Sequence, residues 1–118
     1  VRDSYVWRVP EGAAVRWTRM GDGNVEIERY LRRFAEFCPG KTVALEVIVT
    51  GPRTYRCLEP AFWDAYRKMP AWEFARFMAI AERGKPQEYA RPPKEQARAR
   101  ELEDMEASLR WVQQTFWM

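Results

Sequence analysis

One carboxylate lies in the middle of the most apolar stretch of the chain. The stretch TVALEVIVT, residues 42–50, is rich in β-branched residues and holds Glu46 at its centre. An unbroken apolar run between turn-forming residues predicts a strand that is buried on both faces. An ionised carboxylate in such a strand costs several kcal/mol unless a cation or strong hydrogen-bond donors meet it. We therefore expect Glu46 to have a partner, which is either an arginine or a metal ion.

A second group of candidate residues lies near the start of the chain. The guanidinium group of Arg8 carries a planar fork of donors that suits a hydroxyl or phosphate group. Trp7 and Trp17 flank the loop expected at residues 7–23, and their rings could form apolar walls for the face of a sugar. A solvated arginine, and tryptophans packed in the core or at its rim, are the alternatives. These three residues are our candidates for substrate binding.

The elements that must position these residues alternate between strand and helix. The sequence predicts a short strand at the start, a helix at 24–37 with Asn24 as N-cap, the strand at 42–50, and a helix from Pro70 to Gly84. A wholly apolar strand followed by a helix is typical of a parallel sheet, which binds ligands at the C-terminal ends of its strands. We therefore expect function to lie in the loops at 7–23 and 51–60.

The last part of the chain is a linker followed by a helix. Residues 87–93 contain several prolines and predict a linker, whereas residues 94–118 predict a helical extension. The helix repeats apolar residues in one narrow stripe, at Leu102, Met105, Leu109, Val112 and Phe116. This stripe should pack on something, either within the chain or in a homo-oligomer. The aromatic residues between 62 and 77 should form core or interface rather than a stacking platform.

Composition narrows the class of protein. With 118 residues, 47% hydrophobic and 14% aromatic content, the chain should be globular. It has no apolar run approaching the ~18 residues of a membrane span, and we expect no membrane partner. Its net charge is +3 with acids and bases interspersed, which does not favour a nucleic-acid partner. Two unpaired cysteines, Cys38 and Cys57, favour reduced thiols in a cytoplasmic protein, and the lack of histidine leaves no imidazole for a metal site or triad.

Three segments carry a resemblance to a known family. In GDGNVEIERYLRRFAEFCPGKTVALEVI a glycine turn precedes a helix and then a strand whose glutamate stands within LE. The segment with FW, Y and PAWEFARFMAIAERGKP is similar to one bacterial branch, and the opening VRDS matches a His-x-(Lys/Arg)-Asp strand without its histidine. Together these motifs resemble the sugar phosphate isomerases and epimerases of the xylose isomerase-like TIM barrels, which are related to endonuclease IV. The match covers most of residues 1–86.

The resemblance implies an α/β fold and a set of functional residues. Residues 1–86 would be the C-terminal fragment of a (β/α)8 TIM barrel, strands seven and eight with their helices, because a complete barrel needs ~250 residues. Glu46 would be the catalytic residue and a ligand of a divalent metal ion (Mn, Mg, Co or Zn), moving a proton of a sugar or sugar phosphate through an enediolate. The resemblance also implies a substrate role for Arg8 and for Asp3, which with Arg2 replaces the family's Lys/Arg-Asp pair. A surface ion pair of Arg2 with Asp3 is the alternative.

Three functions remain open at this point. The first is part of a metal-dependent sugar isomerase or epimerase, with this chain incomplete for catalysis by itself because the other ligands would lie upstream. The second is a nucleic-acid enzyme of the endonuclease IV type, which would need several metal-binding histidines. The third is a non-catalytic binding or assembly module that uses the aromatic segment and the terminal helix for partner contact. If the chain is an isolated barrel fragment, an unpaired strand edge at residues 42–50 should make it prone to associate when expressed alone.

Overall fold

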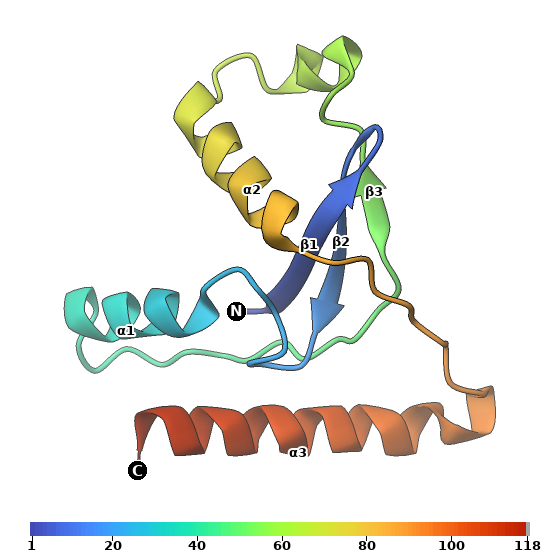
Figure 1. Cartoon of the computed structure of the whole chain (residues 1–118). Helices are drawn as coiled ribbons and strands as arrows, with labels where there is room; N and C mark the ends of the chain where they lie inside the picture. Colours follow the sequence, from blue (N-terminus) through green and yellow to red (C-terminus); the bar gives the residue numbers. More distant parts are fainter. Residues whose placement is uncertain (118) are drawn as a thin grey trace.

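The computed structural model describes residues 1–117 and contains one small antiparallel sheet (Figure 1). The strands β1 (Asp3–Val9), β2 (Gly12–Thr18) and β3 (Arg53–Tyr55) lie in the order β1-β2-β3. β1 and β2 form a hairpin in which Val9 pairs with Gly12. Gly12 has a φ of +156°, and a Cβ there would lie 2.2 Å from the carbonyl oxygen of Tyr55. Only glycine therefore allows β3 to approach the hairpin so closely.

The prediction of a parallel sheet made of barrel strands seven and eight is wrong, because the strands pair antiparallel. The residues that follow β1 turn back at once to form β2, so residues 12–18 of the expected loop at 7–23 are an antiparallel strand. The segment 42–50 lies outside the sheet and belongs to neither a helix nor a strand. Two of its backbone N–H groups donate to the neighbouring chain, Glu46 N–H to the carbonyl of Val1 (2.9 Å) and Thr50 N–H to that of Trp17 (3.2 Å). The fold is a mixed α/β arrangement with an antiparallel sheet.

Burial along the segment 42–50 explains why its composition misleads. Val43, Leu45 and Val47 are half-buried against an apolar cluster, whereas Glu46 and Ile48 are exposed. The segment thus packs on one side only, with the alternation of an extended chain. The segment looks like a strand buried on both faces because its exposed side carries apolar residues too. Only the side of Val43, Leu45 and Val47 is packed.

Helix α1 (Ile27–Phe37) begins later than the sequence predicts, with Glu26 and not Asn24 at the N-cap position. The predicted N-cap, Asn24, pairs instead with the edge of β1: its Oδ1 accepts from Val6 N–H and its Nδ2 donates to the Val6 carbonyl, both at 2.8 Å. The amide side chain therefore acts like a neighbouring strand and satisfies both backbone groups of Val6. Glu26 precedes the helix in a left-handed conformation without a side-chain cap.

Helix α2 (Ala71–Arg83) covers one face of the hairpin (Figure 1). It runs from Pro70 to Gly84, as the sequence predicts, and follows a short 3-10 helix, η1 (Pro60–Ala65). A buried cluster of Val6, Ala13 and Ala81 joins helix and sheet, with half-buried apolar residues around it. At Gly84 the helix end meets the backbone of Val6 directly. α2 is thereby held on β1 at its C-terminal end.

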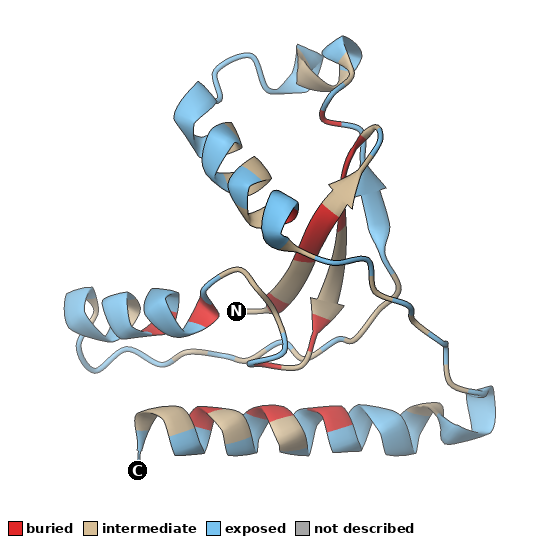
Figure 2. Cartoon of the chain, in the orientation of Figure 1, coloured by how far each residue is buried: buried red, intermediate tan, exposed pale blue. Residues whose placement is uncertain are grey.

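Helix α3 (Ala97–Phe116) follows the short η2 (Lys94–Gln96) and lies along the other end of the sheet (Figure 1). Its buried residues are Asp104, Ser108 and Val112, and Figure 2 shows them on the side that faces the rest of the chain. The predicted stripe is therefore only partly used, because Leu102 is 58% exposed and Leu109 52% exposed. Met118, the last residue of the predicted extension, lies outside the described residues. No helix within residues 1–117 is long and apolar enough to cross a membrane.

Candidate functional site

Glu46 and Trp17 come together through Arg2. The guanidinium of Arg2 donates to Glu46 Oε1 at 2.5 Å and lies 3.9 Å from the centroid of the Trp17 ring. The hydrogen bond from Arg2 lowers the pKa of Glu46 below its ordinary value, and the same bond raises the pKa of Arg2. Glu46 therefore has a cationic partner within the chain. Its side chain is exposed, so the ion pair lies at the surface.

Asp3 is fully buried and holds the turn that precedes α1. Its Oδ2 accepts hydrogen bonds from the backbone N–H groups of Gly21 (2.8 Å) and Gly23 (3.1 Å), and its Oδ1 accepts one from Ser4 (2.8 Å). Burial raises the pKa of the Asp3 carboxyl, and these three backbone donors oppose the rise. Both oxygens are engaged by the backbone, so the structure gives Asp3 a role in positioning the glycine turn.

Trp7 and Arg8 lie on opposite faces of the sheet, because they are consecutive residues of β1. Trp7 is buried and packs beside Tyr5, with 6.2 Å between the ring centroids. Arg8 lies on the face covered by α2, where its Nε is 2.9 Å from Glu82 Oε1. The predicted substrate-binding residues therefore do not converge on one cavity. Of the candidates, only Trp17 lies beside the Glu46 ion pair.

The described residues do not form the metal site that the resemblance implies. Within residues 1–117, no three side chains of the types His, Cys, Asp and Glu lie close enough together to hold a metal ion. A divalent cation such as Mg²⁺ or Mn²⁺ binds several oxygen ligands, whereas the carboxylate of Glu46 faces the cation of Arg2. Metal binding at Glu46 would need ligands from outside these residues.

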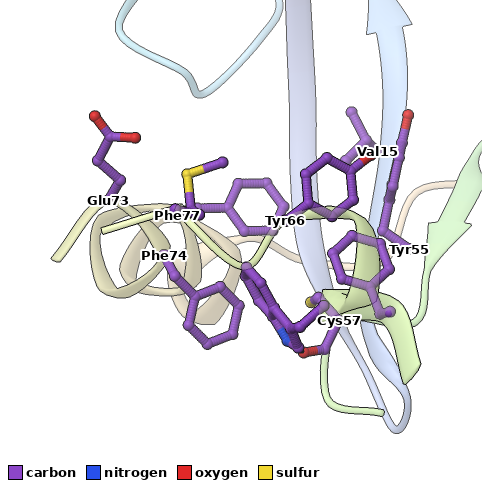
Figure 3. A pocket seen from close by; sticks show the side chains of 10 residues that line it. Val15, Tyr55, Cys57, Tyr66, Glu73, Phe74 and Phe77 are labelled. Atoms are coloured by element: carbon purple, nitrogen blue, oxygen red, sulfur yellow. The ribbon is translucent and has the colours of Figure 1, made fainter. Parts of the chain in front are cut away.

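An apolar cavity, which we call the aromatic cleft, lies on the α2 face of the sheet. It has a volume of about 450 Å³ and lies between η1, α2 and the sheet (Figure 3). Aromatic residues supply six of its ten lining side chains, and Glu73 is the one charged residue in the lining. The lining consists of Val15, Tyr55, Cys57, Phe62, Trp63, Tyr66, Met69, Glu73, Phe74 and Phe77.

Trp63 organises the aromatic side of the cleft. Its Nε1–H donates to the carbonyl of Cys57 at 2.9 Å, which fixes the indole ring against the chain that enters η1. The ring meets Phe74 of α2 edge to face, with 4.8 Å between the centroids and 81° between the planes. Phe62 and Tyr66 continue the cluster as a stacked pair at 5.1 Å. Such pairs stabilise by ~0.5–1.5 kcal/mol beyond area burial, so η1 and α2 are held together by their rings.

The sheet provides the remaining wall and the floor. Tyr55 of β3 pairs with Ala13, which places its side chain on the same face as Val15 of β2. Cys57 is buried, with its Sγ 3.9 Å from Sδ of Met78. Burial raises the pKa of the Cys57 thiol, and the charge of Arg8 opposes the rise. The thiol is therefore a neutral, apolar part of the floor.

Sequence reasoning found part of this site and missed the rest. The aromatic residues at 62–77 were expected to form core or interface, and they do cluster, but their cavity was not predicted. Tyr55 and Cys57 lie in the segment 51–60, where the sequence predicts a functional loop, but no pattern in the sequence marks either residue as part of a site. The β-branched Thr54 and the aromatic Tyr55 are only a weak strand signal. The pairing of β3 with β2 is what brings Tyr55 to the cleft.

Comparison of the chain with known protein families, with characterised proteins and with solved structures finds no match. The likeness to xylose isomerase-like barrels therefore stays a prediction from the sequence motifs. The geometry of the two places described above, the aromatic cleft and the Arg2–Glu46 pair, is the basis for the functional proposals.

Proposed function

We propose that this chain acts as a non-catalytic binding module and that the aromatic cleft is its binding site for a small organic molecule. The observation that carries the proposal is the lining: six aromatic side chains and a single charge around about 450 Å³. Small-molecule sites are concave and mostly apolar, with few polar groups and volumes of roughly 300–1,000 Å³. The cleft meets each of these criteria.

Exposure at the mouth of the cleft supports a binding role over a purely structural one. Tyr55 is 38% exposed and Tyr66 46% exposed, although both rings line the cavity. An aromatic cluster that serves only as core would be covered by the chain's own residues. A bound ligand would cover the exposed parts of these rings. Each Å² of apolar surface that it removes from water favours binding by ~25 cal/mol.

Titration with two compact aromatic probes tests the proposal. The probes are 3-tert-butylphenol and its trimethylammonium analogue, and the readout is the NMR signal of the Trp63 indole N–H group, which is bonded to the floor of the cleft. We expect at least one probe to shift this signal saturably, and Tyr66→Ala to weaken its binding roughly three- to tenfold, as loss of one aromatic contact predicts.

The matched control is Tyr30→Ala, which removes a tyrosine from α1, outside the cleft lining, that is 58% exposed against 46% for Tyr66. Its affinity for the probe should equal that of the unmodified chain. Failure of both probes to shift the Trp63 signal, or equal weakening by both tyrosine variants, would refute the proposal.

The sugar isomerase or epimerase is the second candidate function. It is favoured by one observation, the meeting of a cation, an aromatic face and an exposed carboxylate at Arg2, Trp17 and Glu46. These groups suit a sugar, whose hydroxyls bind charged groups and whose ring face packs on an indole. Titration with a sugar phosphate tests it: NMR shifts confined to residues around Trp17 and Glu46, and abolished by Glu46→Gln, would support the isomerase. Absence of such shifts would count against it.

We also propose that the protein works in the cytoplasm. Cys38 and Cys57 are both free, and such thiols persist where the compartment is reducing. Thiol titration of freshly lysed cells should find both cysteines reduced, and a disulfide-linked product there would contradict this location.

A further inference from the structure

We propose that the ligand of the aromatic cleft is an organic cation, a small molecule with a quaternary or N-alkylated ammonium group. This inference rests on the proposed binding function and names the chemical class of the ligand. Glu73 provides the opposite charge, and the ring faces of the cleft provide the remaining attraction.

The charge of the lining favours a cation. Glu73 is the one charged residue among the ten that line the cleft, and it lies in the first turn of α2 at the cleft's edge (Figure 3). Two basic groups near the cleft are already paired, Arg8 with Glu82 at 2.9 Å and Arg67 with Asp64 at 2.5 Å. A third, Arg76 of α2, lies over the ring of Trp72, which does not line the cleft.

The arrangement of the rings favours a cation with an alkylated head group. Trp63 meets Phe62 at 76°, Tyr66 at 75° and Phe74 at 81°. A compact group beside this cluster therefore faces rings in more than one orientation. Ring faces carry negative electrostatic potential, and rings set at steep angles around a site are the usual means of binding quaternary ammonium groups.

The low polarity of the lining distinguishes an alkylated ammonium from a primary one. A primary ammonium group loses strong hydrogen bonds to water when it enters an apolar site and needs acceptors there to replace them. The cleft offers tyrosine hydroxyls and one carboxylate at its edge, but its wall is mainly ring carbon. An alkylated head group spreads its charge over methyl groups that pack on the rings, so it loses less on leaving water.

The two probes used above separate charge from shape. The compounds 3-hydroxyphenyltrimethylammonium and 3-tert-butylphenol have nearly the same size, and differ in a positive nitrogen against a neutral carbon. At about pH 6.5 both keep the phenolic proton, since phenols titrate near pH 10. We expect the cation to bind about tenfold more tightly than the neutral probe, and its affinity to fall as salt is added.

Glu73→Gln tests the role of the carboxylate. It should weaken binding of the cation roughly three- to tenfold and leave binding of the neutral probe unchanged. The matched control is Glu36→Gln, which removes an exposed glutamate from α1. That variant should bind both probes like the unmodified chain.

The outcomes are distinguishable. If neither probe binds, the binding function itself fails, and this inference fails with it. If both probes bind with equal affinity, or the neutral probe binds more tightly, the cleft is a binding site but its ligand is not a cation. If the cation binds more tightly and Glu73→Gln has no more effect than Glu36→Gln, the assignment of Glu73 as its counter-charge is overturned.

Discussion

Replacing Gly84 by alanine tests how α2 is held against the sheet. Gly84 follows the helix with a φ of −73°, a conformation that alanine adopts without strain. Backbone entropy alone therefore predicts that Gly84→Ala stabilises the fold by about 0.4–1 kcal/mol. The packing predicts the opposite, because a Cβ at this position would lie 1.9 Å from the carbonyl oxygen of Val6.

The size of the effect follows from that distance. An ordinary carbon–oxygen contact is about 3.3 Å, so the end of α2 must move by roughly 1.4 Å (3.3 minus 1.9) away from β1. The obstructing atom belongs to the backbone of a paired strand, which cannot rotate aside as a side chain can. Overpacking costs ~1–3 kcal/mol, and we expect Gly84→Ala to lie near the upper end of that range.

Urea unfolding followed by tryptophan fluorescence measures the free energy change. Gly51→Ala is the matched control, because its Cβ would lie 3.3 Å from the ring of Tyr89, a side chain on a linker that can adjust. The control should change the free energy of unfolding by less than about 0.5 kcal/mol. If Gly84→Ala proves as stable as Gly51→Ala, or more stable than the unmodified chain, the close contact of α2 with β1 is incorrect.

Three further predictions concern buried and charged groups. Ser108→Ala should destabilise the fold by about 1–3 kcal/mol in urea unfolding, because the buried N–H of Met20 loses its acceptor at 3.1 Å, whereas Ser4→Ala should have little effect. Asp3 has a raised pKa, so its contribution to stability should fall as pH rises from 3.8 through the raised value, and Asp3→Asn should remove that part of the pH dependence. Glu46 has a lowered pKa, so the stability from its ion pair should be present above pH 4.5 and be lost as pH falls through the lowered value. Glu46→Gln should therefore abolish this acid-side loss without unfolding the chain, and marked destabilisation at neutral pH would contradict the surface position of the pair.

The helices could be predicted where their ends are set locally. Pro70 and Gly84 bound α2 in the sequence and in the structure, because the constraint acts within one turn of the helix. The start of α1 was misplaced for the opposite reason. Asn24 has the chemistry of an N-cap, yet its amide binds the edge of β1, a partner 18 residues away that no local pattern reveals.

The sheet could not be predicted because its signals are ambiguous. The hairpin of β1 and β2 turns at Pro10 and Glu11, without the Asn-Gly or Asp-Gly pair that marks a two-residue turn. The run at residues 42–50 has the composition of a buried strand, but composition does not say whether one face or both are covered. The open face is apolar at Ile48 as well as charged at Glu46, and that combination hides the one-sided packing.

The shape of the chain bears on the choice between a self-sufficient enzyme and a binding module. Its radius of gyration is 16.1 Å, whereas a compact domain of this length has about 13.5 Å. The excess reflects two separate apolar clusters, one under α2 and one under α3, instead of a single core.

Catalysis needs reacting groups that densely packed neighbours hold to within a fraction of an ångström. The predicted site residues are instead spread over these separate regions. The aromatic cleft is built locally, by α2, η1 and one face of the sheet. Binding there does not require the rest of the chain to be densely packed, because a bound ligand completes the local packing. The two separate clusters thus support the proposed binding role, in which the bound ligand adds to the apolar packing under α2.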